Sequence, residues 1–109
     1  MKYNVETFVN NIEYLTLYGY EPEITIRLKN NQSVFVIAYR DFLELTDDTD
    51  VMKKLNSVRE LLAFVDFENV IGIEGDIDFE FPVQSQSIVV DGNLWINARN
   101  DDRKNRRHL

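Results

Sequence analysis

Four carboxylates alternate along residues 72–81, which read Gly-Ile-Glu-Gly-Asp-Ile-Asp-Phe-Glu-Phe. In an extended chain every second side chain points to the same face, so this spacing predicts one strand over residues 73–81 with an acidic outer face. The four candidate partner-binding residues are Glu74, Asp76, Asp78 and Glu80. Neighbours in such a row lie about 7 Å apart, so two can share a cation weakly, but no further ligands close its coordination shell. The stretch indicates an anionic protein-binding surface.

A second acidic group stands in the run Thr-Asp-Asp-Thr-Asp at residues 46–50, and its carboxylates are Asp47, Asp48 and Asp50. The run lacks the glycine and the distal glutamate of an EF-hand loop, which disfavours calcium binding. It suits a helix N-terminus, where capping side chains and negative charge are favourable. We predict that these carboxylates also contact the partner, in an arrangement relative to the acidic row that the sequence leaves open.

Groups suited to catalysis are scarce. The chain has no cysteine, and its one histidine, His108, is the second residue from the end. A nucleophilic serine or threonine needs a fixed base beside it, which a frayed terminus does not supply. Carboxylates on an outward strand face lack the burial that shifts a pKa toward catalytic use. The sequence therefore predicts a protein that is not an enzyme and has no cofactor. A carboxylate-dependent metal-binding protein or enzyme stays open as the second of two alternatives to a non-catalytic binding protein.

The charge of the chain is unevenly distributed. Residues 1–102 hold all 19 acidic residues and eight basic ones, a net charge of −11, whereas residues 103–109 carry four basic residues. An acidic body repels nucleic acid and attracts basic surfaces. We predict one acidic domain over residues 1–99 and a flexible basic tail over residues 100–109. No apolar run approaches the ~20 residues of a membrane span, and the start lacks a signal core, so we expect a cytoplasmic protein.

The elements that position these groups follow from hydrophobic periodicity. Residues 4–18 show a helical stripe that starts at a capping residue, Asn4, and stops before Gly19. Residues 24–29 alternate between apolar and polar types, and residues 33–39 are apolar on both faces, so they predict a hairpin whose second strand is central. Residues 48–65 carry another helical stripe.

The last third of the chain is predicted to be β-structure. The strand at residues 73–81 comes first, although a turn at Gly75 is a competing interpretation that would split it into strands at 70–73 and 77–81. Asp-Gly-Asn at residues 91–93, between apolar segments at 87–90 and 94–98, is a hairpin signal. The predicted order is α-β-β-α-β-β-β. This order defines an α+β two-layer domain with two helices and a mainly antiparallel sheet of about five strands.

Three tyrosines, Tyr3, Tyr14 and Tyr18, are predicted to project together from the side of the first helix opposite its apolar stripe. Tyrosine is enriched in protein interfaces, so Tyr14 and Tyr18 are candidate apolar anchors for a partner. Covering loops or the sheet edge is the other role open to these side chains. A structural homo-oligomer, such as a homodimer with a tyrosine-lined interface, is the first alternative function.

Together these features favour a small acidic binding protein without catalysis of its own. Its partner would be a basic protein, such as a nuclease or another nucleic-acid-binding protein, whose channel the carboxylates occupy in place of phosphates. In size, acidity and lack of catalytic groups the chain resembles inhibitors carried by phages and other mobile elements, and immunity proteins that neutralise basic toxins. No motif carries this general resemblance. It implies an inhibitory nucleic-acid mimic whose body binds neither nucleic acid nor membrane directly.

Overall fold

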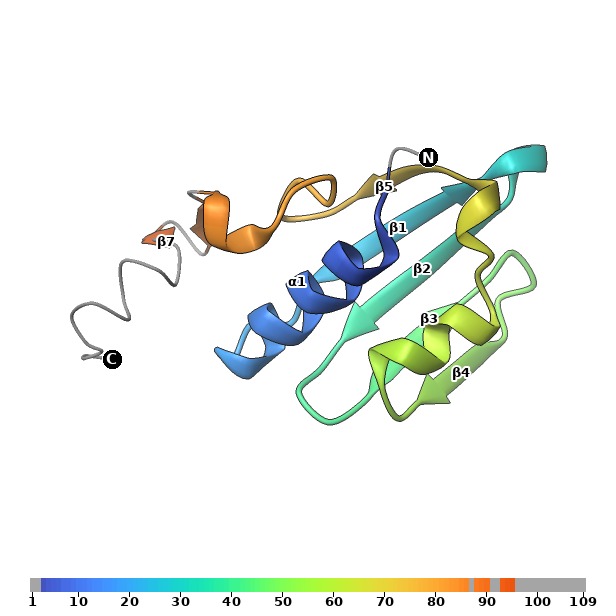
Figure 1. The fold of residues 1–109 in the computed structure, drawn as a ribbon. Helices are drawn as coiled ribbons and strands as arrows, with labels where there is room; N and C mark the ends of the chain where they lie inside the picture. The colour runs from blue at the N-terminus through green and yellow to red at the C-terminus, as the bar shows by residue number, and fades with distance from the viewer. Residues whose placement is uncertain (1–2, 87, 91–92, 96–109) are drawn as a thin grey trace.

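The computed structural model describes residues 3–86, 88–90 and 93–95, and its fold is α+β, as predicted (Figure 1). A five-stranded antiparallel sheet has the strand order β4-β3-β2-β1-β5, and a separate two-stranded sheet pairs β6 with β7. One α-helix and four short 3₁₀ segments make up the other elements of the described residues. The elements are α1 (Val5–Leu17), β1 (Glu23–Leu28), η1 (Lys29–Asn31), β2 (Ser33–Ala38), β3 (Leu43–Thr46), β4 (Met52–Leu55), η2 (Val58–Ala63), η3 (Phe67–Asn69), β5 (Val70–Glu74), η4 (Val83–Ser85), β6 (Ile88–Val90) and β7 (Asn93–Trp95).

Helix α1 forms where the sequence predicts it. The Oδ1 of Asn4 accepts a hydrogen bond from the N–H of Thr7 at 3.0 Å, which satisfies one of the free donors of the first turn. The apolar stripe is buried against the sheet, with Phe8 and Ile12 among its residues. Gly19, at a φ of 88°, ends the helix in the left-handed conformation that glycine adopts without strain.

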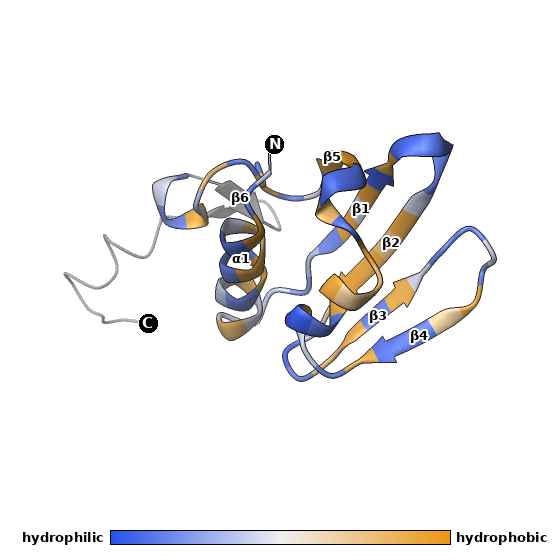
Figure 2. Cartoon of the chain, turned by 45° about the vertical axis from the view of Figure 1, so that its right-hand side comes forward, coloured by the Kyte–Doolittle hydropathy of each residue, from blue (hydrophilic) through white to orange (hydrophobic). Residues whose placement is uncertain are grey.

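The first hairpin is also confirmed. β1 and β2 pair with Ile24 opposite Val36 and Ile26 opposite Val34, and all four side chains are buried. β2 is the middle strand of the sheet and is hydrophobic along most of its length (Figure 2). The sheet is covered on one face: α1 and the yellow-green η2 segment both lie in front of the strands in Figure 1. The single hydrophobic core fills the space between these two layers.

The predicted second helix at residues 48–65 is wrong. β3 and β4 form a second hairpin, with Leu43 opposite Leu55, and the chain then turns into the 3₁₀ segment η2. Leu55 and Leu61, both on the predicted stripe, are buried, but Val51 is exposed. The apolar residues therefore reach the core without a continuous helix. The order of elements fits the prediction only roughly, because β3 and β4 replace that helix.

The predicted C-terminal hairpin is confirmed as β6 and β7, with Val90 opposite Asn93. These strands were expected to belong to the main sheet, but they form a sheet of their own. The five strands of the main sheet are instead completed by β3 and β4. The predicted basic tail at residues 100–109, and His108 within it, lie outside the described residues.

Candidate functional site

The acidic stretch that the sequence singles out does not form one strand. β5 ends at Glu74, and the chain bends at residues 75–77. Ile77 and Phe79 are buried, so the apolar half of the alternation does face the core. The competing interpretation, in which a turn at Gly75 splits the stretch into two strands, is right about the break. Its second strand is wrong, because residues 77–81 do not form a strand. The predicted row of four carboxylates on one strand face is therefore wrong.

The four carboxylates instead occupy separate local positions. Glu74 forms an ion pair with Arg27 of β1, with 3.6 Å between Oε2 and Nη1. The Oδ1 of Asp78 accepts a hydrogen bond from the N–H of Glu80 at 2.9 Å, which shapes the loop after β5. Asp76 and Asp78 are exposed. Contact of these side chains with a partner stays a prediction, but they would act as scattered charges and not as a row.

Asp47, Asp48 and Asp50 belong to the turn between β3 and β4, and not to the helix cap predicted from the sequence. The Oδ1 of Asp47 accepts bonds from the Oγ1 and the N–H of Thr49 at 2.6 and 2.9 Å. These bonds lower the pKa of Asp47 because they stabilise its charged form. The Oδ2 of Asp48 accepts from the N–H of Ser33 at 3.4 Å, which ties the turn to β2. The turn thus presents three carboxylates at one end of the sheet.

Tyr14 and Tyr18 lie together on α1, with ring centroids 4.7 Å apart and an interplanar angle of 55°. Tyr18 is 40% exposed, whereas Tyr14 is half-buried against the core. Tyr3 does not join them, contrary to the prediction: it is buried, and its hydroxyl accepts a hydrogen bond from the N–H of Ile73 at 3.2 Å. The candidate tyrosine anchor is therefore a pair and not a cluster of three.

A site that the sequence did not indicate surrounds Phe64, the residue after η2, whose side chain is 50% exposed. Two surface hollows share Phe64 in their lining. The larger, of about 460 Å³, lies between the first turn of α1 and residues 62–68, and the smaller, of about 200 Å³, lies beside the β3–β4 turn. Each contains two carboxylates. We call this the Phe64 surface, and its main residues are Val5, Leu62, Ala63, Phe64, Asp66 and Glu68 in the larger hollow, with Asp47 and Asp48 in the smaller.

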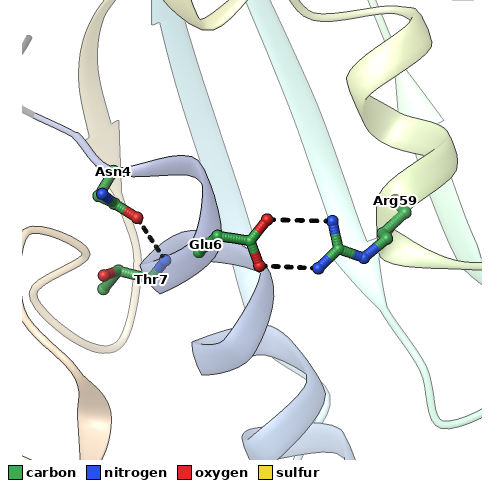
Figure 3. Close-up of polar contacts among 4 residues, drawn as sticks. All are labelled: Asn4, Glu6, Thr7 and Arg59. Carbon is green, nitrogen blue, oxygen red and sulfur yellow. Dashed lines mark hydrogen bonds and ion pairs between the residues drawn. The ribbon is translucent and has the colours of Figure 1, made fainter.

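An ion pair next to the larger hollow connects the elements that border it (Figure 3). The Nη2 of Arg59 in η2 lies 2.8 Å from the Oε1 of Glu6 in α1, and Nη1 lies 3.2 Å from Oε2. The hydrogen bonds and the charge of Arg59 hold the pKa of Glu6 below its ordinary value of 4.5. Such a two-bond pair also fixes the orientation of both side chains. The pair bridges η2 and the first turn of α1, which also carries Val5 of the hollow.

The electrostatics of the described body are strongly negative. Residues 3–86 contain 16 acidic and six basic residues, a net charge of −10. Two of the basic residues, Arg27 and Arg59, are paired with glutamates. Carboxylates therefore outnumber the available positive charges over the whole of this segment. Its surface attracts cationic groups and repels phosphates.

The described part of the chain holds neither a metal-ligating cluster nor a membrane-spanning helix. It contains no group of three or more His, Cys, Asp or Glu side chains that could hold a metal ion. It also contains no helix with the length and apolar character needed to cross a membrane. What the arrangement can do is present hollows that are lined by both apolar side chains and carboxylates. No protein-family model matches the chain, and neither the curated proteins nor the solved structures contain a significant match.

Proposed function

We propose that this chain is a non-catalytic binding protein that engages, and thereby inhibits, a basic protein which handles nucleic acid. The observation that carries this proposal is the net charge of −10 over residues 3–86, together with carboxylates grouped around exposed apolar surface at Phe64. A basic nucleic-acid channel attracts such a surface and orients it during the encounter. Carboxylates in the channel then take the place of phosphates, which blocks access of the nucleic acid.

Two variants with the same change in net charge test this proposal. The first neutralises the carboxylates of the Phe64 surface (Asp47→Asn, Asp48→Asn, Asp66→Asn and Glu68→Gln). The second neutralises Glu74, Asp76, Asp78 and Glu80 in the same way. Asparagine keeps the Oδ1 acceptor, so the turn at residue 47 and the cap at residue 66 retain their hydrogen bonds.

The measurement is displacement of a fluorescent DNA duplex from a histone and from a cationic ribonuclease, at 50 and 300 mM salt. We expect displacement by the unaltered protein, weaker displacement at high salt, and a larger loss in the first variant than in the second. A larger loss in the second variant would move the site to residues 74–80. Absence of displacement at low salt, or equal displacement by all three proteins, would refute an acidic binding function.

A homodimer is the second candidate, and the exposed end of α1 favours it. Leu17 and Tyr18 are both exposed large side chains, and Tyr18 contacts the ring of Tyr14. Sedimentation velocity at micromolar concentration measures the oligomeric state of the protein and of the Leu17→Ser, Tyr18→Ser double variant. A dimer that this variant separates into monomers supports the candidate. A monomer, or a dimer that the variant leaves intact, excludes this interface.

A further inference from the structure

The larger hollow of the Phe64 surface is open because of the way the chain leaves η2. Leu61, Val65 and Phe67 turn inward and are buried in the core. The residues between Leu61 and Val65 are consequently left at the surface, with Phe64 half exposed. Val5, in the first turn of α1, lines the hollow from the opposite side. Local 3₁₀ geometry therefore produces a depression that is lined by apolar side chains together with polar and charged ones.

The size of this hollow fits an inserted side chain. Its volume of about 460 Å³ is that of an open surface depression, with room for one leucine or phenylalanine side chain and space left over. Hot spots in protein interfaces are typically such depressions, filled by one aromatic or aliphatic residue of the partner. Buried neighbours pack behind the walls, and the exposed ion pair between Glu6 and Arg59 bridges α1 and η2, so the hollow is present in the unbound chain.

The charge around the hollow selects the residues that flank such an anchor. Asp66 and Glu68 lie in its lining, and Asp47 and Asp48 lie in the neighbouring hollow across Phe64. Phosphates of a nucleic acid or an anionic lipid would be repelled at this position. Lysine or arginine side chains next to an apolar anchor would find carboxylates on both sides of the ring.

We propose that the larger hollow receives one apolar side chain, leucine or phenylalanine, from a lysine- and arginine-rich segment of the protein partner. This inference rests on the proposed function, since it assigns the partner's chemistry at the same surface. The inserted side chain adds a specific, short-range contact to the general electrostatic attraction between the two proteins. The carboxylates bring the basic segment to the surface, and the hollow determines its register.

Two synthetic peptides separate these contributions. Both have 13 residues of alternating lysine, arginine and glycine with a fluorescent label, and they differ at the central position, which is leucine in one and serine in the other. We expect the leucine peptide to bind about tenfold or more tightly, because burying a leucine side chain contributes that much to an equilibrium constant. The difference should persist from 50 to 300 mM salt, although both affinities fall. Amide shifts in the nuclear magnetic resonance spectrum should concentrate in residues 62–68 for the leucine peptide alone.

Filling the hollow with a side chain of the protein itself should remove the preference for the leucine peptide. Ala63→Trp places a large side chain at the exposed position in the lining, and Gln84→Trp places the same side chain at an exposed position of η4. We expect Ala63→Trp to abolish the preference for leucine over serine while leaving the binding of the serine peptide unchanged. Gln84→Trp should keep the full preference. A cooperative thermal unfolding transition in each variant is the check that the variant is folded.

The outcomes keep the two proposals apart. Equal affinity for the two peptides, or leucine-specific amide shifts away from Val5, residues 47–48 and residues 62–68, overturns the inference while salt-dependent binding still supports the acidic binding function. No binding of either peptide at 50 mM salt overturns both. Removal of residues 103–109 tests a different occupant, the chain's own basic residues. If that removal raises the affinity for the leucine peptide more than for the serine peptide, the hollow serves the chain itself and the inference is wrong.

Discussion

Asn11, in the middle of α1, holds Val83 in place across 72 positions of sequence: its Oδ1 accepts a hydrogen bond from the N–H of Val83 at 2.7 Å. Its Nδ2 donates to the carbonyl of Phe81 at 3.0 Å. The asparagine is buried, and so is the side chain of Val83. This polar side chain of the helix thus bonds two backbone groups of an irregular segment that has no strand partner. Together with the burial of Ile77 and Phe79, this contact places the chain after β5.

Replacing this asparagine tests that role. Asn11→Ala leaves the buried N–H of Val83 without its acceptor, and an unsatisfied buried donor costs about 1–3 kcal/mol of unfolding free energy. The carbonyl of Phe81 still accepts from Gln86 Nε2 at 2.9 Å, so the loss comes mainly from the donor. Urea denaturation measures the change. Asn10→Ala is the control at an exposed neighbour and should be neutral or slightly stabilising, because alanine favours the helix. Equal changes of unfolding free energy in the two variants would show that the hydrogen bonds of Asn11 do not stabilise the fold.

Gly75 is where the chain leaves the sheet, and a methyl group there would make two unusually tight contacts. An added Cβ would lie 3.0 Å from the Cε2 of Phe79 and 3.1 Å from the carbonyl oxygen of Glu23. Gly75→Ala should therefore lower the unfolding free energy by about 1–3 kcal/mol, as overpacking typically does. At Gly72 the nearest atom to an added Cβ is the Cδ of Arg27 at 3.6 Å, an ordinary contact. Gly72→Ala is the matched control, and up to about 1 kcal/mol of stabilisation is expected from alanine in a strand. A Gly75→Ala variant that is more stable than Gly72→Ala would contradict the close contacts at Gly75.

The parts of the fold that the sequence predicts are those whose local pattern agrees with their packing. Helix α1 has a cap, a stripe and a terminal glycine, and the β1–β2 hairpin has alternation in its first strand, an apolar second strand and asparagine at its turn. The region at residues 48–65 fails because Met-Lys-Lys-Leu consists of strong helix formers. It becomes β4 only through pairing with β3, a long-range preference that overrides local propensity.

The candidate site was predicted only in part, for the same reason. Asp47 and Asp48 were expected to face a partner, and they lie in the Phe64 surface, although on a turn instead of a helix cap. The sequence pattern did not single out Phe64, because the exposure of its side chain depends on the 3₁₀ geometry of η2 and on the inward turn of Val65. The alternation at residues 73–81 was satisfied by a bent chain, since burial of Ile77 and Phe79 does not require a strand.

The ion pair between Glu6 and Arg59 predicts a pH dependence of stability. Arg59 lowers the pKa of Glu6 below 4.5 in the folded protein, so the pair stabilises the fold above that ordinary value. The contribution is lost as the pH falls through the lowered pKa and Glu6 takes up a proton. In Arg59→Gln the pKa of Glu6 should rise toward 4.5, and a carboxyl titration by nuclear magnetic resonance measures it. A Glu6 pKa that is the same in both proteins would contradict this interaction.

Two adjacent lysines of β4 lie on opposite faces of the strand, because successive strand residues project to opposite sides. The Nζ of Lys53 lies 5.8 Å from the ring centre of Phe64, while that of Lys54 lies 4.7 Å from the ring centre of Phe42. Lys53 therefore places a positive charge at the surface that we propose binds a basic segment. Lys53→Gln should increase the affinity for the leucine peptide about two- to fivefold at 50 mM salt, the scale of one exposed charge contact. Lys54→Gln makes the same change in net charge on the other face and should have a smaller effect. Equal gains from both substitutions would mean that the peptide responds to total charge alone, and binding would then not be located at Phe64.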